Sequence, residues 1–210
     1  MLSDGRPTNG YRRGDAPPKI LPLPAVGRDV AGVFWRPSEA FVDELAAALA
    51  GKKVLEVFAG NGYLAGLLAQ RGIDVVATSV LSSMDAHQRG LYHPVQDMNA
   101  VRAVIQLGED CDALLMCWPT VTNQALLAAD LWSQDDGRQI VFIGEFTDYA
   151  KNYLGGCATD EFFERFRPTQ DFASYRGNML EKACMGTLEP EAPSCHDDPT
   201  AAPQEERWAG

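Results

Sequence analysis

Residues 52–72, KKVLEVFAGNGYLAGLLAQRG, join a strand-like apolar run to two closely spaced glycines and then to a helical pattern. Gly60 permits a tight turn, and Gly62 permits a ligand to approach the backbone closely. The spacing Gly60-x-Gly62-x-x-Ala65 also satisfies the dinucleotide fingerprint. The stretch therefore predicts a site for an adenosine-containing cofactor. The alternative is a glycine turn that only packs the helix on the strand.

A carboxylate inside this expected strand narrows the choice of cofactor. Glu56 lies four residues before Gly60, and a buried carboxylate needs a partner, which the ammonium group of S-adenosylmethionine (SAM) could supply. The dinucleotide fingerprint expects an acid about 20 residues further on for the ribose, whereas the second expected strand ends in Thr78 and Ser79. A helix is also expected before the first strand, which is unusual for a dinucleotide fold. These features favour SAM over a nicotinamide dinucleotide, which stays as an alternative.

Two further candidate side chains follow the fourth and fifth expected strands. Trp118 comes just after a buried strand and before a proline, and Glu145 ends the next strand along the chain. We expect both to face one cleft, with Trp118 as an apolar wall and Glu145 as a residue that orients or deprotonates an acceptor. The alternative for Glu145 is a structural bond to the Gly155-Gly156 segment.

Alternating strands and helices between residues 31 and 186 would position these side chains. The expected strands are 54–58, 74–79, one near 92–95, 112–117 and 139–144, and the expected helices are 39–50, 62–70, 99–107, 123–132 and 160–166. This alternation predicts an α/β fold with a parallel sheet and right-handed crossovers, and a ligand site at the carboxyl ends of the strands. A late antiparallel strand at 178–185 is expected to pair with one near Phe172.

At this level the sequence resembles a known family. VLEVFAGNGYLA, at 54–65, resembles motif I of the class I SAM-dependent methyltransferases, and the order of strands and helices extends the resemblance over about residues 38–184. More narrowly, LLMCWPTVTNQALLAADLW, IVFIGEF and GGCATDEFFERF are similar to a group of bacterial methyltransferase-like proteins. The resemblance implies a Rossmann-like methyltransferase fold, a mostly parallel central sheet flanked by helices. It also implies SAM as the cofactor and methyl transfer to an unidentified small-molecule or protein acceptor.

The resemblance also implies which residues contact the cofactor. They are Glu56, Phe58, Ala59, Gly60, Asn61, Gly62, Thr78, Ser79, Asp97, Met98 and Cys117. Phe58 stands where motif I usually has its first glycine. No acid follows the second strand, so Thr78 or Ser79 would bond the ribose through a hydroxyl group, which is weaker than a charge-assisted bond.

Two of these positions have structural alternatives. Asp97 would bond the adenine amino group while Met98 packs on the ring, but Asp97 is equally suited to cap the helix at 99–107. Cys117 begins the segment CWPT, where amino-group methyltransferases have Asp, Asn or Ser, and a role as a small core residue is favoured for it. The incomplete motif and the missing acid leave a catalytically degenerate binding or regulatory protein as a further alternative.

Composition bounds the remaining possibilities. The chain has 210 residues, of which 46% are hydrophobic, so one domain with a full core and two tails is expected. Residues 1–30, rich in Pro, Gly and Arg, are expected to form a flexible or wrapping arm. Residues 187–210 are expected to be a disordered acidic tail. The net charge of −11 disfavours long nucleic acids, whose phosphates attract basic surfaces, and favours a small-molecule or protein partner.

Cysteine usage and hydropathy bear on location. The five cysteines form no C-x-x-C pair, which predicts neither a disulfide framework nor a metal site and favours a reducing cytoplasm. No apolar run reaches the length of a membrane span, and the N-terminus has no apolar segment of a secretory signal. A cytoplasmic protein without a membrane segment is therefore expected.

Overall fold

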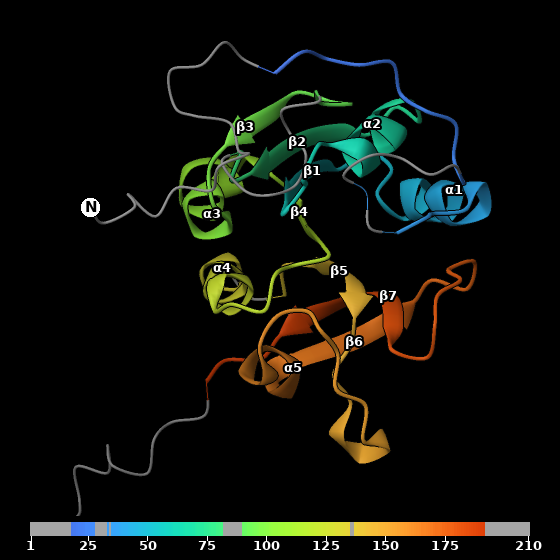
Figure 1. Ribbon diagram of the computed structural model, residues 1–210. Coiled ribbons are helices and arrows are strands. Elements are labelled where there is room, and N and C mark those ends of the chain that lie inside the picture. The colour runs from blue at the N-terminus through green and yellow to red at the C-terminus, as the bar shows by residue number, and fades with distance from the viewer. Residues whose placement is uncertain (1–17, 28–32, 34, 82–89, 135–136, 192–210) are drawn as a thin grey trace, which may run out of the picture.

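The computed structural model describes residues 18–27, 33, 35–81, 90–134 and 137–191 (Figure 1). Its centre is a seven-stranded sheet in the order β3-β2-β1-β4-β5-β7-β6. The strands are β1 (Lys53–Val57), β2 (Asp74–Ser79), β3 (Val95–Asp97), β4 (Ala113–Cys117), β5 (Ile140–Glu145), β6 (Phe166–Asp171) and β7 (Glu181–Leu188). The first five pair in parallel, and β7 is antiparallel to both β5 and β6. The predicted α/β fold class, with its antiparallel C-terminal strand, is confirmed.

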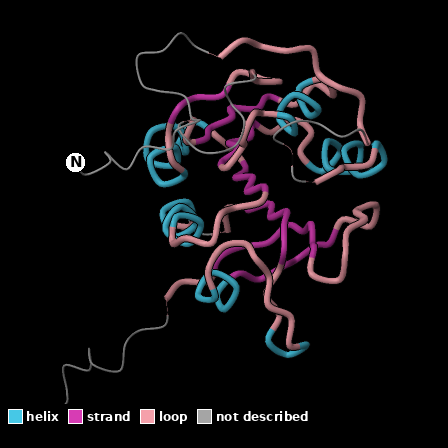
Figure 2. Tube along the Cα trace, in the orientation of Figure 1, coloured by secondary structure: helices cyan, strands magenta, loops and turns pink. Residues whose placement is uncertain are grey.

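Helices cover both faces of this sheet (Figure 2). They are α1 (Glu39–Ala48), α2 (Tyr63–Ala69), α3 (Ala100–Leu107), α4 (Gln124–Trp132) and α5 (Asp160–Arg165), with short 3-10 turns η2 (Gly108–Asp110) and η3 (Tyr149–Lys151). Side chains of α1 and α2 form the core on one face, and those of α3, α4 and α5 form the core on the other. Because both faces are covered, β4 is buried at every position, as its unbroken apolar sequence indicates.

Local sequence explains where two of the helices begin. The Ser38 hydroxyl accepts a hydrogen bond from the Phe41 amide at 3.2 Å, which confirms the expected cap of α1. The Asn99 side chain accepts from the Arg102 amide at 2.9 Å and caps α3. The expected cap by Asp97 is therefore wrong, because Asn99 stands directly before the first helical residue.

The C-terminal strands differ from the expected ones. The Asn178 side chain accepts hydrogen bonds from the amides of Leu180 and Glu181, and this turn delays the start of β7 until Glu181. Its partner β6 starts at Phe166, so α5 ends one residue earlier than expected and the strand near Phe172 lies further toward the N-terminus than expected.

The ends of the domain also lie elsewhere than expected. β7 continues to Leu188, whose side chain is 6% exposed, so the domain includes at least two residues that were assigned to the acidic tail. At the other end, the amide of Leu21 donates to the carbonyl of Leu91 at 2.7 Å, and the amide of Leu91 donates to the carbonyl of Lys19 at 2.9 Å. Part of the expected arm is thus bound to the domain. Residues 1–17, 28–30 and 192–210 lie outside the described residues.

The described residues contain neither a helix that could span a membrane nor a cluster of metal-binding side chains. None of the helices found there has the length and apolarity needed to cross a membrane. Within the same residues, no three His, Cys, Asp or Glu side chains are grouped so that they could hold a metal ion. Four of the cysteines, Cys111, Cys117, Cys157 and Cys184, are buried and free of disulfides.

Candidate functional site

A cavity of about 540 Å³ opens at the carboxyl ends of β1, β2 and β4. Its volume lies within the range of small-molecule sites. The turn after β1, the start of α2, the ends of β2 and β4, the β3–α3 connection and two short segments at 33–35 and 156–157 supply its walls. The cavity therefore lies where a parallel sheet of this topology is expected to bind a ligand.

The structure brings most of the predicted site residues to this cavity. Those that line it are Glu56, Phe58, Ala59, Gly60, Asn61, Ser79, Met98, Cys117 and Trp118. Four predicted residues, Gly62, Thr78, Asp97 and Glu145, are not among the residues that line it. Each of these four has a contact within the protein that accounts for its position.

The turn after β1 is built from residues in the left-handed region. Phe58, Gly60 and Gly62 have φ values of 60°, 55° and 75°. A Cβ atom added to Gly60 would meet nothing within 4 Å, so the cavity is open at this glycine. A Cβ atom on Gly62 would lie 2.9 Å from Cγ2 of Val95 and 3.1 Å from the carbonyl of His93. Gly62 thus permits close packing against the chain at His93 and Val95, and its expected role in ligand approach stays a prediction.

Glu56 provides a buried carboxyl group at the edge of the cavity. Its side chain is 1% exposed. The amide of Ala65 donates a hydrogen bond to the carboxyl group, while Oε2 has no partner among the described residues. Burial raises the pKa of Glu56 to about 8, because desolvation penalises the charged form. A cationic group in the cavity would favour ionisation and supply the missing partner.

The predicted ribose and adenine contacts separate in the structure. Thr78 is fully buried and its hydroxyl donates to the carbonyl of Glu56 at 3.2 Å, so it is not available to a ribose. Ser79 and Met98 line the cavity. Asp97 is exposed, and its Oδ1 accepts from the Leu81 amide at 3.0 Å. Of the two hydroxyls considered for the ribose, only that of Ser79 lies on the cavity.

Trp118 leaves β4 through an unusual backbone conformation. Its φ of 53° lies in the left-handed region, which bulky residues rarely adopt. The amide of Trp118 donates to the carbonyl of Ile143 at 2.7 Å and holds the turn in place. The buried indole Nε1 has no hydrogen-bond partner among the described residues. Strained residues of this kind cluster at functional sites, and Trp118 does line the cavity as predicted.

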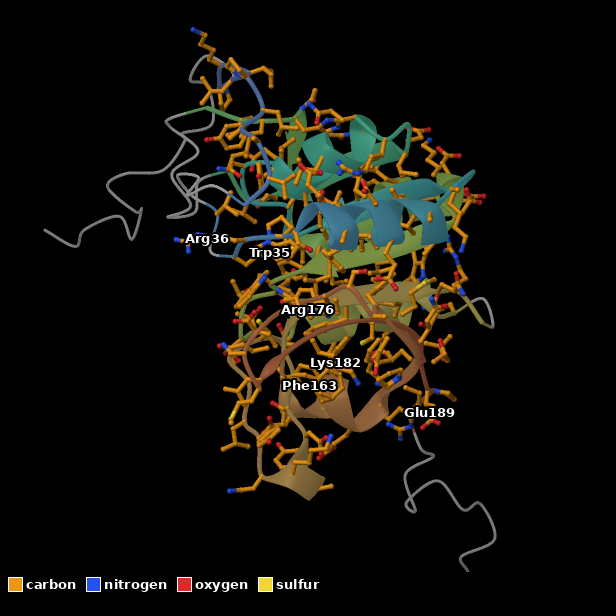
Figure 3. All side chains as sticks on the ribbon, turned by 90° about the vertical axis from the view of Figure 1, so that its right-hand side faces the viewer. Trp35, Arg36, Phe163, Arg176, Lys182 and Glu189 are labelled. Carbon is orange, nitrogen blue, oxygen red and sulfur yellow. The ribbon has the colours of Figure 1, made fainter. Side chains whose placement is uncertain are left out.

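Cys117 precedes Trp118 and is almost completely buried. Burial raises the pKa of its thiol well above the ordinary value, and the side chain of Trp35 forms a hydrogen bond with it. Trp35 in turn packs edge-on against Phe41, with ring centroids 5.8 Å apart, and lies 6.2 Å from the ring of Tyr175. Figure 3 shows Trp35 on the side of the molecule that carries Arg176. A neutral thiol held in this way fits the structural alternative for Cys117 better than nucleophilic chemistry.

Glu145 has the structural contact that was its alternative. Its Oε2 accepts a hydrogen bond from the amide of Gly156 at 2.6 Å. Gly156 and Cys157 line the cavity, whereas Glu145 does not. Glu145 thus makes the structural bond that was its alternative, and its expected role toward an acceptor stays a prediction.

Sequence reasoning missed several residues that line the cavity, notably Trp35, Tyr63 and Gln124. Trp35 lies in a stretch without periodicity, so nothing in the sequence connects it to the site. Gln124 is the first residue of α4 and follows the CWPT segment closely. The only signal in the sequence for Gln124 was its position shortly after the end of β4, where Trp118 was already predicted to line a cleft.

The strand order, the left-handed turn after β1 and the cavity at the carboxyl ends of the strands define an α/β protein of the Rossmann-like methyltransferase fold. No protein-family model matches the sequence, and no curated protein matches it either. The chain is similar to several solved methyltransferase structures, at identities too low to indicate more than the fold.

Three of these structures illustrate the likeness. Human N-acetylserotonin methyltransferase in complex with SAM is 11% identical, with a TM-score of 0.49, over 72% of this chain and 52% of that one. The CcbJ methyltransferase from Streptomyces caelestis is 14% identical, with a TM-score of 0.48, over 73% and 91% of the two chains. Magnesium protoporphyrin IX methyltransferase from Synechocystis PCC 6803 with bound SAM is 17% identical, with a TM-score of 0.46, over 71% and 78%.

The chain thus spans about half the length of the human protein, 52%. The assignment of the fold rests on the strand order and register of the chain itself.

Proposed function

We propose that the protein binds SAM in this cavity and transfers its methyl group to an acceptor. The observation that carries the proposal is the Glu56 carboxyl group, which is buried at the cavity and has one oxygen without a partner among the described residues. A buried acid without a charged partner is costly, and the ammonium group of SAM is a partner of the right charge. The open backbone at Gly60 gives the same ligand room beside it.

Other lining residues fit the remaining parts of SAM. Ser79, at the end of β2, and Met98 both line the cavity, where the hydroxyl of Ser79 would bond the ribose and Met98 would pack on the adenine ring. The hydroxyl bond replaces the charge-assisted bond that an acid would give, so the affinity for SAM is expected to be modest.

The chemistry follows from the reactivity of the cofactor. SAM supplies a methyl group on a positively charged sulfur, which a nucleophile displaces in line. Burial raises the pKa values of Tyr63, Cys117 and Cys157, so these cavity residues stay protonated at neutral pH. The part of the protein is therefore to hold the acceptor in line and exclude water. The acceptor is a small molecule or a group on another protein.

A thermal-shift and calorimetry panel on the full chain tests the proposal. SAM and S-adenosylhomocysteine should raise the melting temperature, while NAD and NADP should leave it unchanged. Glu56→Gln should abolish the response to SAM, and the matched variant Glu109→Gln, at an exposed acid, should keep it.

Other outcomes favour the rival functions. A response to NAD or NADP alone would favour a nicotinamide-dependent oxidoreductase that uses the same glycine turn. Binding of SAM without methylation of any acceptor in a screen with labelled SAM would favour a regulatory protein of the same fold. A response to none of the four ligands would contradict the proposal.

A further inference from the structure

Three buried polar atoms without hydrogen-bond partners belong to residues that line the cavity. They are Oε2 of Glu56, Nε1 of Trp118 and Oε1 of Gln124. The two other unpaired atoms found among the described residues, the hydroxyls of Ser133 and Thr159, belong to residues that do not line it. Buried polar groups are normally paired, so this concentration marks a place where a ligand completes the hydrogen bonding.

The ammonium group of the proposed cofactor would pair with Oε2 of Glu56. Nε1 of Trp118 and Oε1 of Gln124 then still need a hydrogen-bond partner. They differ in chemical character, because an indole Nε1–H is only a donor and an amide oxygen is only an acceptor. Trp118 and Gln124 also lie on one stretch of chain, the connection from β4 to α4. This connection is distinct from β1, which carries Glu56, and from the turn after β1, which carries Gly60.

The backbone at this connection is built for a defined position of the indole. The left-handed conformation of Trp118 is fixed by the bond from its amide to Ile143, and the neighbouring Gly144 leaves room for it. A Cβ atom on Gly144 would lie 3.5 Å from Cα of Trp118 and 3.0 Å from Sγ of Cys157. Strain of this kind persists where the surrounding structure holds the residue in place, so the donor is preorganised.

Apart from Glu56, the described residues that line the cavity carry no formal charge. Those of the β4–α4 connection are Cys117, Trp118, Pro119, Thr120, Thr122 and Gln124, and Val33, Trp35 and Cys157 line the cavity as well. The cysteine thiols stay neutral because burial raises their pKa values. Moving an ion from water to such a wall without a partner is costly, so the walls favour an uncharged group.

We propose that the acceptor is an uncharged molecule or side chain with an amide-type edge, in which a carbonyl oxygen or aromatic nitrogen stands beside an N–H group. Carboxamides, lactams and nucleobases share this edge. Trp118 donates to the carbonyl oxygen or ring nitrogen, and Oε1 of Gln124 accepts from the N–H. The inference rests on the proposed function, because it assigns to the acceptor the part of the cavity that SAM leaves free. It concerns the edge by which the acceptor is held.

Four ring compounds of similar size distinguish the effect of ligand charge on binding from the effect of hydrogen bonding. Benzamide presents the full edge, acetophenone keeps the carbonyl but lacks the N–H, benzoate is an anion, and benzylamine is a cation at neutral pH. Their binding to the full chain is measured by ligand-observed NMR titration in the presence of saturating S-adenosylhomocysteine. Benzamide should bind best, acetophenone roughly two- to tenfold more weakly because one hydrogen bond is lost, and the two ions more weakly still.

Two variants test the assigned residues. Trp118→Phe keeps an aromatic wall and removes the donor, and Gln124→Met keeps the length of the side chain and removes the acceptor. Each should weaken benzamide by roughly two- to tenfold. Gln124→Met should also abolish the preference for benzamide over acetophenone. The matched control is Gln106→Met, at an exposed position of α3, which should change nothing.

Several results would overturn the inference while leaving the proposed function intact. These are no detectable binding of benzamide, equal or better binding of benzoate or benzylamine, or unchanged affinity in both variants. Competition between benzamide and S-adenosylhomocysteine would show that the two residues belong to the cofactor site, and would overturn it as well. Failure of the proposed function gives a different result, namely no thermal response to SAM or S-adenosylhomocysteine.

Methylation assays with labelled SAM distinguish the two kinds of molecule that could carry the amide-type edge. Free lactams and nucleobases form one set of acceptors, and peptides that contain asparagine or glutamine form the other. Methylation in either set supports the inference and identifies the source. Methylation confined to amines or carboxylic acids contradicts it.

Discussion

Two aromatic residues hold left-handed backbone conformations at the ends of neighbouring parallel strands. Phe58 follows β1 with φ 60°, and Trp118 follows β4 with φ 53°. Each such conformation costs on the order of 1–3 kcal/mol. In the sheet order, β1 and β4 stand where the connections change direction, which is where open α/β sheets bind ligands. At both positions the chain turns sharply where the strand ends, and Phe58 and Trp118 both line the cavity.

The buried acid at the same place makes stability depend on pH. The pKa of Glu56 is about 8 in the folded chain, against an ordinary 4.5. The folded state therefore holds a proton that the unfolded state has lost, and stability falls as the pH rises from about 4.5 to about 8. Glu56→Gln keeps an oxygen for the Ala65 amide and removes this loss. We expect the variant to be more stable than the wild type by about 4 kcal/mol at pH 7.5.

Chemical denaturation at pH 4.5 and pH 7.5 measures this effect. The difference between variant and wild type should be small at the lower pH and large at the higher pH. A variant that is less stable at both pH values would show that the carboxyl group is a net contributor to folding.

Affinity for SAM should depend on the same proton. Binding an ammonium group requires Glu56 in its ionised form, so the proton must leave when the ligand binds below pH 8. The affinity is then expected to rise with pH between 6 and 7.5, by up to about tenfold per pH unit. Calorimetry in two buffers of different ionisation enthalpy measures both the affinity and the released proton. A flat profile with no proton release would separate Glu56 from the ligand.

The two glycines of the turn have different roles, which substitution by alanine distinguishes. At Gly62 the added methyl group would meet Val95 and the carbonyl of His93, whereas at Gly60 it would enter open space. Both residues have positive φ, which costs an alanine about 1 kcal/mol. We expect Gly62→Ala to lose clearly more stability than this. Gly60→Ala should stay folded and lose affinity for SAM.

Thermal melting and calorimetry on both variants check this assignment. Equal losses of stability would mean that the chain before β3 moves aside without cost. Unchanged affinity in Gly60→Ala would place the ligand away from the turn.

At the scale of elements, the sequence predicted the regular parts of the fold and missed the irregular ones. Apolar runs and caps located β1, β2, β4, β5 and the five helices to within a few residues, because burial on two faces leaves a strong pattern. The start of β7 depends on the Asn178 turn, and the partner of β7 depends on long-range pairing. Neither leaves a periodic signal.

The same contrast holds for the candidate site. Residues in the glycine turn and at strand ends, such as Glu56 and Gly60, could be placed because their position along a strand fixes where they lie. Trp35 could not, since it reaches the cavity from a segment far away in the sequence through contacts with Cys117 and Tyr175. For Glu145 the sequence left two roles open, and the bond to the Gly155-Gly156 segment is the one that the structure contains.

The carboxylate of Glu145 holds the segment after β5 through the amide of Gly156. Substitution of Glu145 measures how much this bond contributes to stability. Glu145→Gln keeps an oxygen that can accept from the Gly156 amide, so it should leave stability nearly unchanged. Glu145→Ala removes the acceptor and should cost about 1–2 kcal/mol. It should also loosen the wall formed by Gly156 and Cys157 and weaken the binding of an acceptor. Thermal melting separates the variants, and a large loss of turnover in Glu145→Gln at unchanged stability would instead favour a general base.

At the scale of the whole molecule, the C-terminal hairpin of β6 and β7 forms one edge of the sheet, and its loop is bonded to α1. The amides of Ala173 and Ser174, in the loop between β6 and β7, donate to the carboxylate of Glu44 in α1 at 3.0 and 2.7 Å. These bonds lower the pKa of Glu44. The loop also places Tyr175 against Trp35. Residues that are more than a hundred positions apart in the sequence therefore meet beside the cavity, and the hairpin belongs to the folding unit.

The end of this hairpin decides where the chain can be shortened. Leu188 is buried. Glu189 forms two hydrogen bonds with Arg165: its amide donates to the Arg165 carbonyl at 3.0 Å, and its carbonyl accepts from the side-chain Nε of Arg165 at 2.9 Å. Truncation after Gly186 removes all of these contacts. Loss of a buried leucine alone costs about 1.5–3 kcal/mol, so we expect the melting temperature to fall by roughly 5–10 °C.

Truncation after Glu191 is the matched control, because it keeps every one of those contacts and removes only residues 192–210, whose Pro- and acid-rich composition cannot repay the entropy of ordering. Its melting temperature should equal that of the full chain. Leu188→Ala in the full chain should reproduce most of the loss seen after Gly186, since the buried side chain contributes more than the exposed ion pair of Glu189 with Arg167. Equal melting temperatures for the two truncations would show that the last residues of β7 add no stability to the fold. A fall after Glu191 would show that the acidic tail packs on the domain, and the boundary of the folding unit would then lie further along the chain.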